Sequence, residues 1–231
     1  MKTINRLFYR FLFPTKRDIL RKPRVSYDYN NIIFKNIIIF GYQGSGKTST
    51  ANAIASVAVK RYGERNVNAV MSEEGDLNLL MNYGLQDKLV NILFADNLTL
   101  RKLNRSELME YFRIRHKAKN SLGMSNGYIL SMLALHRFHS IPVELRTNMD
   151  ALIVKDSSMN PYDRNILKKF IGKEHLDMLD YISINRDHNP KLKALSIFCN
   201  KSIVGVIKLP LCRRSYLSNI SRIDILRRIR C

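Results

Sequence analysis

The stretch GYQGSGKT, residues 41–48, directly follows the apolar run NIIIF, residues 36–40, and precedes a segment with the apolar spacing of a helix. The pattern is G-x-x-x-x-G-K-T between a predicted strand and a predicted helix. Glycines permit a tight turn whose backbone N–H groups face one pocket, and the helix directs its positive N-terminal end into the same pocket. The alternative, an ordinary glycine-rich turn, would not need a strand before it and a helix after it. The stretch is therefore predicted to bind the phosphates of a nucleoside triphosphate.

Each residue type in this stretch has a distinct expected task. Lys47 is predicted to reach the β- and γ-phosphates, and the Thr48 hydroxyl to hold Mg²⁺. ATP is the default nucleotide, because no motif that reads guanine is visible. The residues predicted to contact the nucleotide are Gly41, Tyr42, Gln43, Gly44, Ser45, Gly46, Lys47, Thr48 and Ser49.

A second apolar run, residues 89–95, ends in Asp96 and Asn97. Open α/β sheets bind ligands at the carboxyl ends of their strands, so this run delivers a carboxylate to the expected ligand edge. Asp96 is predicted to hold Mg²⁺ together with Thr48, opposite Lys47. Apolar strands that end in Asp are common. The prediction for Asp96 therefore depends on the phosphate loop, residues 41–48, being present in the same chain.

The length of 231 residues suits one α/β domain with small appendages. We expect a basic amphipathic leader at residues 1–26, an ATPase domain at 27–210 and a basic tail at 211–231. Lys and Arg number 39 against 19 Asp and Glu, a formal net charge of +20. Such an excess suggests a polyanionic partner, either nucleic acid or an acidic membrane surface, whereas a bias spread evenly over solvated faces is the alternative.

Three cysteines without metal spacing, together with the lack of a secretory signal, predict a cytoplasmic, intracellular protein. No apolar run approaches the ~20 residues that span a bilayer. The apolar segment at residues 7–13 is broken by Arg10 and stopped by Pro14. It is compatible with a helix lying on a membrane surface or with one packed on the domain.

Alternation of strands and helices along the chain favours an α/β fold with a mostly parallel sheet and helices on both faces. The last two strands are expected to form a β-hairpin around Asn200 and Lys201. Strands are expected at 27–34, 36–40, 67–71, 89–95, 128–135, 150–155, 192–198 and 202–208. Helices are expected at 48–62, 77–83, 104–120, 160–170 and 173–181.

In this order of motifs the chain, over about residues 30–210, resembles the FtsK–HerA class of P-loop ATPases, which includes DNA translocases and viral genome-packaging motors. The phosphate loop corresponds to Walker A and residues 90–96 to Walker B. A helix containing Arg115-His116 follows, and then a strand that leads to His136. A Pro- and Arg-containing segment at 141–148 and a further strand at 151–154 complete the order. The resemblance implies a RecA-like P-loop NTPase fold.

The resemblance also implies catalytic roles, with two departures from the pattern of the class. His136 stands where a sensing Gln is expected, and it can still hydrogen-bond a γ-phosphate or the attacking water, with a charge that varies with pH. It can equally be an ordinary side chain at the end of a strand. Asn97 replaces the acidic residue that usually follows the Walker B Asp. Glu73 or Glu74 is the candidate to align and deprotonate the water, although both can equally be surface carboxylates.

Arg146 is the best candidate for a finger that reaches the γ-phosphate of a neighbouring subunit, and Arg137 is the second. Either can equally be a structural arginine. Fingers that act between subunits imply a ring-like homo-oligomer. The basic segment at residues 101–119 is expected to contact the phosphate backbone of double-stranded DNA, or else to be a plain solvated helix face.

The expected function is thus an ATPase that couples ATP hydrolysis to translocation or packaging of double-stranded DNA. One alternative is an AAA+-like replication initiator or helicase loader, for which a C-terminal helical lid would be expected. The other is a nucleotide-gated module that binds DNA or a membrane surface with little hydrolysis, which Asn97 would allow. Membrane contact is the less favoured partner, and no small-molecule substrate beyond the nucleotide is expected.

Overall fold

The structure of the chain is a computed structural model, and it describes residues 2–21, 31–98, 105–139 and 141–221. Within this part, eight strands form one sheet in the order β7-β6-β5-β1-β4-β3-β2-β8. The strands are β1 (Asn31–Phe40), β2 (Val67–Ser72), β3 (Val90–Ala95), β4 (Asn126–Leu135), β5 (Ala151–Val154), β6 (Leu195–Cys199), β7 (Val204–Lys208) and β8 (Ser218–Asn219).

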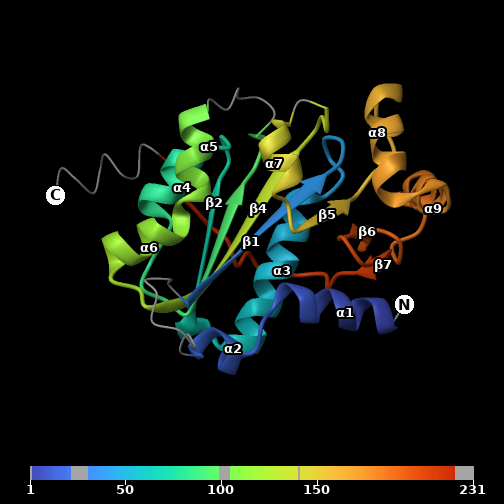
Figure 1. Cartoon of the computed structure of the whole chain (residues 1–231). Helices are drawn as coiled ribbons and strands as arrows, with labels where there is room; N and C mark the ends of the chain where they lie inside the picture. The colour runs from blue at the N-terminus through green and yellow to red at the C-terminus, as the bar shows by residue number, and fades with distance from the viewer. Residues whose placement is uncertain (1, 22–30, 99–104, 140, 222–231) are drawn as a thin grey trace.

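The sheet is parallel from β5 to β8, while β6 runs antiparallel to β5 and β7 antiparallel to β6. The two antiparallel strands are the expected hairpin. Helices lie on both sides of the sheet (Figure 1). They are α1 (Lys2–Leu12), α2 (Lys16–Leu20), α3 (Lys47–Tyr62), α4 (Leu77–Tyr83), α5 (Arg105–Phe112), α6 (Ile114–Leu122), α7 (Val143–Thr147), α8 (Pro161–Ile171) and α9 (Lys173–Asn185), with a 3-10 turn η1 at Glu64–Asn66. The predicted α/β fold is confirmed.

Two apolar layers hold the fold together, one on each face of the sheet. Side chains of α1, α2 and α3 form the layer on one face, and side chains of α4 to α9 contribute to the other. Alternate residues of the central strand β1 serve the two layers: Ile37 and Ile39 face α3, and Ile38 and Phe40 face the opposite side. Burial on both faces explains why the central strands are continuous apolar runs rather than alternating ones.

The expected break at Lys35 and Asn36 was wrong, because β1 is one continuous strand from Asn31 to Phe40. Asn36 is buried in the middle of this strand, and its side-chain oxygen accepts a hydrogen bond of 2.7 Å from the Tyr111 hydroxyl. Lys35 stacks its ammonium 3.7 Å from the centre of the Phe11 ring. Two polar residues that resembled a turn in the sequence thus have tertiary partners, although the side-chain nitrogen of Asn36 is buried without a hydrogen-bond partner among the described residues. Residues 27–30 of the expected first strand lie outside the described residues.

The single helix expected at 104–120 is two helices, α5 and α6, in the structure. Arg113 separates them with φ −88° and ψ 7°, a backbone conformation outside the helical range. The run at 128–135 is indeed a strand, β4, and it pairs in parallel with β1 over ten residues and with β3 on its other side. The phosphate loop therefore emerges from the middle of the sheet.

The N-terminal helices α1 and α2 pack on the sheet. Phe8, Leu12 and Phe13 are buried against the sheet, and the Phe8 ring lies edge-on to Phe198 of β6 at 4.9 Å between centroids. The division into leader, domain and tail stays a prediction, since residues 22–30 and 222–231 lie outside the described part. Among the described helices, none combines the length and the apolar character required to cross a bilayer.

Candidate functional site

The phosphate loop connects the end of β1 to the first turn of α3. Gly44 and Gly46 have φ of +79° and +82°, a left-handed conformation that side-chain-bearing residues rarely adopt. This conformation explains the two glycines of the pattern. Gly46 occupies the N-cap position of α3, and the helix begins at Lys47. The loop and the positive end of α3 therefore share one site, as expected for phosphate binding.

The predicted metal-binding residues lie together. The Thr48 hydroxyl donates a hydrogen bond of 2.7 Å to Oδ2 of Asp96, which follows β3. β3 is separated from β1 by β4, so this contact spans two strand positions of the sheet. A hydroxyl and a carboxylate oxygen at this separation are a donor set of the kind that Mg²⁺ prefers. The residues present thus fit the predicted ion, and their role in binding it stays a prediction.

A chain of hydrogen bonds links Lys47 to His136 and Asn97. The Lys47 ammonium donates to the carbonyl oxygens of Gly41 and Tyr42, both at 2.9 Å, and lies 3.2 Å from Nδ1 of His136. Nε2 of His136 lies 3.1 Å from Oδ1 of Asn97. An ammonium can only donate, so Nδ1 accepts and Nε2 carries the proton that Oδ1 receives. His136 is therefore held as the neutral ring, protonated on Nε2.

Burial lowers the pKa of Lys47 to about 8, and the carboxylates of Asp96 and Asp156 oppose this shift. The pKa of His136 is also lowered, first by burial and then by the neighbouring Lys47 charge. Both shifts have one physical cause, since a partly buried site disfavours an added positive charge. A phosphate anion at this site would reverse that preference for the lysine.

Asn97 occupies the position of the missing acidic residue and has an unusual backbone. Its φ is +56°, in the left-handed region, where Asn is better tolerated than most residues. Its amide nitrogen donates to the carbonyl oxygen of Glu73 at 3.2 Å, and its backbone N–H donates to Oδ1 of Asp96 at 2.9 Å. Asn97 thus orients Asp96 and His136 together, a positioning task that the sequence did not reveal.

The other predicted catalytic residues lie farther from the loop. Glu73 and Glu74 follow β2 with exposed side chains, and the Glu73 backbone reaches the site through Asn97. Arg146 lies on α7 and lines a separate cavity of about 600 Å³ with Met149, Asp150 and Lys201. Asp150 precedes β5, whereas the phosphate loop lies at the other end of that strand. Arg137 is exposed just after His136. Their catalytic roles stay predictions.

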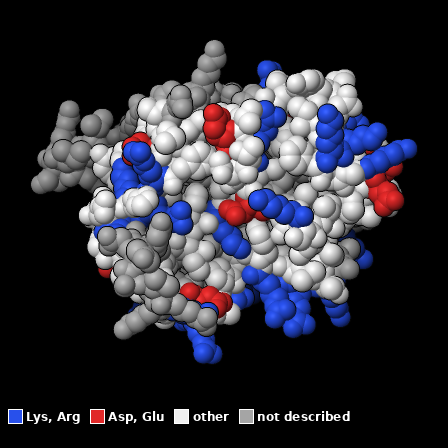
Figure 2. All heavy atoms as spheres, viewed as in Figure 1, with Lys and Arg blue, Asp and Glu red and all other residues white. Residues whose placement is uncertain are grey.

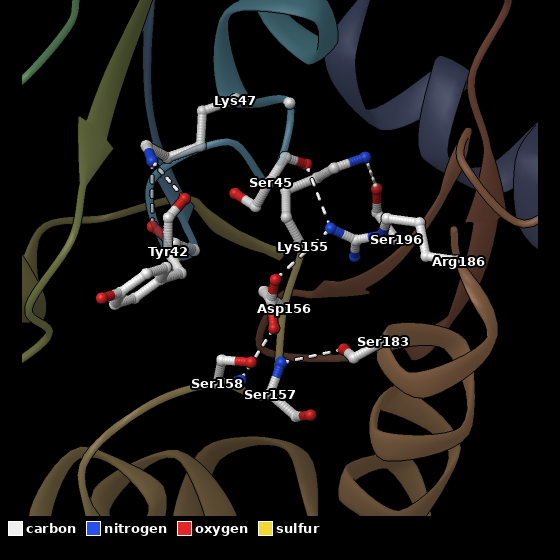
Figure 3. A network of polar contacts seen from close by, with 12 residues as sticks. Tyr42, Ser45, Lys47, Lys155, Asp156, Ser157, Ser158, Ser183, Arg186 and Ser196 are labelled. Atoms are coloured by element: carbon white, nitrogen blue, oxygen red, sulfur yellow. Dashed lines mark hydrogen bonds and ion pairs between the residues drawn. The ribbon is translucent and has the colours of Figure 1, made fainter. Parts of the chain in front are cut away.

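Three charged residues lie beside the loop that the sequence did not identify as candidate site residues. Lys155 and Asp156 follow β5, the strand next to β1, and Arg186 caps α9. Nη1 of Arg186 donates to the Ser45 carbonyl at 3.3 Å and to Oδ2 of Asp156 at 3.4 Å, and Lys155 donates to Ser196 Oγ at 2.9 Å (Figure 3). The position of Lys155-Asp156 at a strand end was a usable signal, the same one that identified Asp96. Arg186 had no such signal, because only the tertiary structure brings α9 to the loop.

No family model and no curated protein sequence matches this chain. Among solved structures, the genome-packaging NTPase B204 of Sulfolobus turreted icosahedral virus 2 in complex with AMPPCP is similar, with a TM-score of 0.52 and 10% identity over 76% of this chain and 98% of that chain. The same NTPase in complex with AMP gives a TM-score of 0.50 and 10% identity over 77% of this chain and 98% of that chain.

The conjugation coupling protein TcpA of pCW3 matches at a TM-score of 0.39 and 12% identity, over 77% of this chain and 60% of that chain. At sequence identities this low, the similarity concerns the fold and does not assign roles to residues. Together with the phosphate loop at the end of a central strand, the likeness to B204 confirms the expected resemblance at the level of the fold. The chain has an α/β fold similar to that of the genome-packaging NTPase B204, with the phosphate loop at the end of a central strand.

Proposed function

We propose that this protein is an ATPase that couples ATP hydrolysis to the translocation or packaging of double-stranded DNA. The observation that carries the ATPase proposal is the contact of 2.7 Å between Thr48 and Asp96, formed beside Lys47 and His136. P-loop NTPases bring a lysine, a metal-holding hydroxyl and a strand-end carboxylate together for phosphoryl transfer. These three groups come from sequence positions 47, 48 and 96 and meet at the N-terminus of α3.

In this proposal the residues of the chain divide the work of hydrolysis. Lys47 leaves the carbonyl oxygens of Gly41 and Tyr42 and binds the β- and γ-phosphates. Mg²⁺, held by Thr48 and Asp96, would neutralise charge on the phosphate oxygens. His136, protonated on Nε2 and held by Asn97, detects the terminal phosphate. Glu73 or Glu74 aligns the attacking water, since Asn97 cannot accept its proton.

The DNA part of the proposal rests on the charge of the chain and on the fold it shares with a genome-packaging NTPase. On the face in Figure 2, Lys and Arg stand in several separate groups and outnumber Asp and Glu. α6 presents exposed Arg115 and Lys119. Contacts to a phosphate backbone would be sensitive to salt and blind to sequence. A ring-like homo-oligomer would let Arg146 or Arg137 reach the site of a neighbour.

An ATPase assay with and without duplex DNA tests this proposal, together with a mass measurement in the presence of nucleotide. We expect hydrolysis that DNA stimulates and that Lys47→Ala abolishes. ATP binding without hydrolysis, combined with salt-dependent DNA binding that survives Lys47→Ala, would favour the nucleotide-gated module. The observation that favours this second candidate function is Asn97, which stands at the position of the acidic residue and cannot act as a base. Within the described residues β6 and β7 pair as the expected hairpin, and this hairpin argues against the helicase loader.

A further inference from the structure

A cavity of about 310 Å³ opens beside the phosphate loop on the side away from Asp96. The loop and the first turn of α3 form one wall, with Ser45 and Ser49. Lys155 and Arg186 form a second wall, and Leu209 and Leu211 provide an apolar one. A cavity with cations beside the loop and apolar residues farther out has the character of a site for a ligand that is anionic at one end and apolar at the other.

Arg186 enters this cavity with most of its donors unused. Its side chain is 11% exposed, and within the described part of the chain its Nε and Nη2 are buried without a hydrogen-bond partner. Its contacts through Nη1, to Ser45 and Asp156, are long for hydrogen bonds (Figure 3). The hydroxyl of Ser45 is likewise buried and unpaired in the described residues. Buried donors without partners are costly, so an anion that paired with them would be favoured.

Lys155 strengthens the attraction for an anion here. It is 2% exposed, and burial, reinforced by the charge of Arg186, lowers its pKa to about 7. Two cations are thus held close together at one edge of the loop, with Asp156 in contact with Arg186 and with Asp187 as a further carboxylate that lines the cavity. Such an arrangement is relieved by a ligand that brings negative charge.

The order of the strands decides which end of a nucleotide would lie in this cavity. Asp96 and His136 follow β3 and β4, on one side of β1, whereas Lys155 and Asp156 follow β5 on the other side. In the proposed function the terminal phosphate lies toward Asp96 and His136. The nucleoside end then points toward β5 and the cavity.

We propose that this cavity binds the nucleoside end of the nucleotide and that Arg186, from the same chain, leaves Asp156 to bind the phosphate nearest the ribose. The inference rests on the proposed function, because it assumes that the phosphate loop binds a nucleoside polyphosphate. A guanidinium offers two parallel N–H donors to a phosphate, which matches the two unpaired nitrogens of Arg186. Its release costs little, since both present contacts are long.

The test compares the affinities of ATP and ADP, measured by calorimetry, for the full chain and two variants. Arg186→Gln removes the charge and is expected to weaken both nucleotides by about tenfold or more. Asp156→Asn breaks the same ion pair but leaves the arginine, so it is expected to bind both nucleotides at least as tightly as the wild type. Thermal melting establishes that the variants are folded.

Equal weakening by the two variants would overturn the proposal, because it would mean that the Arg186–Asp156 pair acts structurally. A loss confined to ATP would also overturn it, since Arg186 would then contact the terminal phosphate. Should Arg186→Gln fail to fold, Arg186→Lys keeps the charge but lacks the two parallel donors; it is expected to lose affinity, and wild-type affinity would overturn the proposal. Failure of the proposed function is distinguishable: without nucleotide binding the wild type would bind neither ATP nor ADP, and if hydrolysis alone were absent the affinities of the variants could still be compared.

Discussion

At the scale of single residues, the site is a set of charges held in a partly buried place. Lys47 has partners for all three of its ammonium protons, namely two carbonyl oxygens of the loop and His136. Asn97 links His136 to the loop that carries Asp96. The residues proposed to bind phosphate thus set the protonation of their neighbours, and pH is a direct probe of them.

Binding of ATP is expected to weaken as pH rises above 8. The pKa of Lys47 is lowered to about 8, so the free protein loses the ammonium charge as pH rises through this value. ATP binding must then take up a proton, and affinity falls by up to about tenfold for each further pH unit. Calorimetry in two buffers of different ionisation enthalpy, at pH 7 and pH 9, measures this proton uptake. An affinity that stays constant from pH 7 to 9 in the wild type would contradict the expectation.

Replacing Lys155 with Met is expected to stabilise the free protein at low pH. The folded-state pKa of Lys155 is about 7, below its ordinary value of 10.5. Below pH 7 both states carry the proton and the burial penalty is complete; between pH 7 and 10.5 the penalty declines, because the folded chain has released the proton. Lys155→Met should therefore gain on the order of a few kcal/mol at pH 6 and little at pH 10.

Denaturant unfolding at these two pH values measures the Lys155 effect. Lys60→Met, at an exposed position of α3, is the matched control and should have a small effect that does not depend on pH. A stability difference for Lys155→Met that is the same at both pH values would contradict the expected titration.

At the scale of elements, strand ends and the turns that follow them build the site. β1, β3, β4 and β5 are parallel, so their carboxyl ends deliver the phosphate loop, Asp96, His136 and Lys155 to one edge of the sheet. The turn after β2 supports the turn after β3: the backbone N–H of Asp96 donates to the carbonyl oxygen of Ser72 at 2.9 Å. The position of Asp96 therefore depends on how closely these two turns approach.

Gly75 is expected to be essential for that approach. Its φ is +63°, and a Cβ at this position would lie 2.7 Å from the carbonyl oxygen of Asp96 and 3.0 Å from the Cα of Leu98. Both atoms are backbone, so Gly75→Ala must displace the turn that carries Asp96. We expect a loss of stability of about 2 kcal/mol or more and a fall in ATP hydrolysis.

Gly123→Ala provides the comparison, because Gly123 has a similar φ of +64°, but among the described residues beyond its chain neighbours no heavy atom lies within 4 Å of the added Cβ. It should cost about 1 kcal/mol from backbone strain and leave hydrolysis unchanged. Thermal melting and ATPase rates of the two variants measure the difference. Equal effects on hydrolysis would show that Gly75 does not position Asp96.

At the scale of the whole molecule, the N-terminal helices complete the apolar layer that covers α3. Phe8 contacts Phe198 of β6, and the side-chain amide of Asn5 exchanges hydrogen bonds with the backbone of Lys208 at 3.1 Å and 2.9 Å. The first residues of the chain thus contact its last two long strands, and α1 adjoins the hairpin in Figure 1. The leader is part of the core as well as a source of positive charge.

Phe8→Ala is expected to destabilise the protein by about 3–5 kcal/mol, the usual cost of removing a fully buried aromatic ring. Phe8 is 0% exposed in the core. Arg6→Ala, at an exposed position of the same helix, should cost less than about 0.5 kcal/mol. Denaturant unfolding of both variants gives the comparison. A Phe8→Ala variant as stable as Arg6→Ala would mean that the leader is separate from the core.

The sequence by itself determined the phosphate loop, the strand-end position of Asp96, the α/β class and the hairpin, because each is a local pattern: glycine spacing, an apolar run and its terminal carboxylate. The sequence also predicted a break within β1, and this prediction was wrong. Asn36 is a strand residue because its side chain contacts Tyr111 on α5, a partner that the local sequence does not reveal.

Only the tertiary structure decided that Asn97 would bridge His136 and Asp96, and that Arg186 would lie beside Ser45. Residues 45 and 186 meet because α9 returns to the edge of the sheet beside β5. No periodicity or spacing encodes such a contact, which depends on how helices pack across the sheet rather than on the order of neighbouring residues.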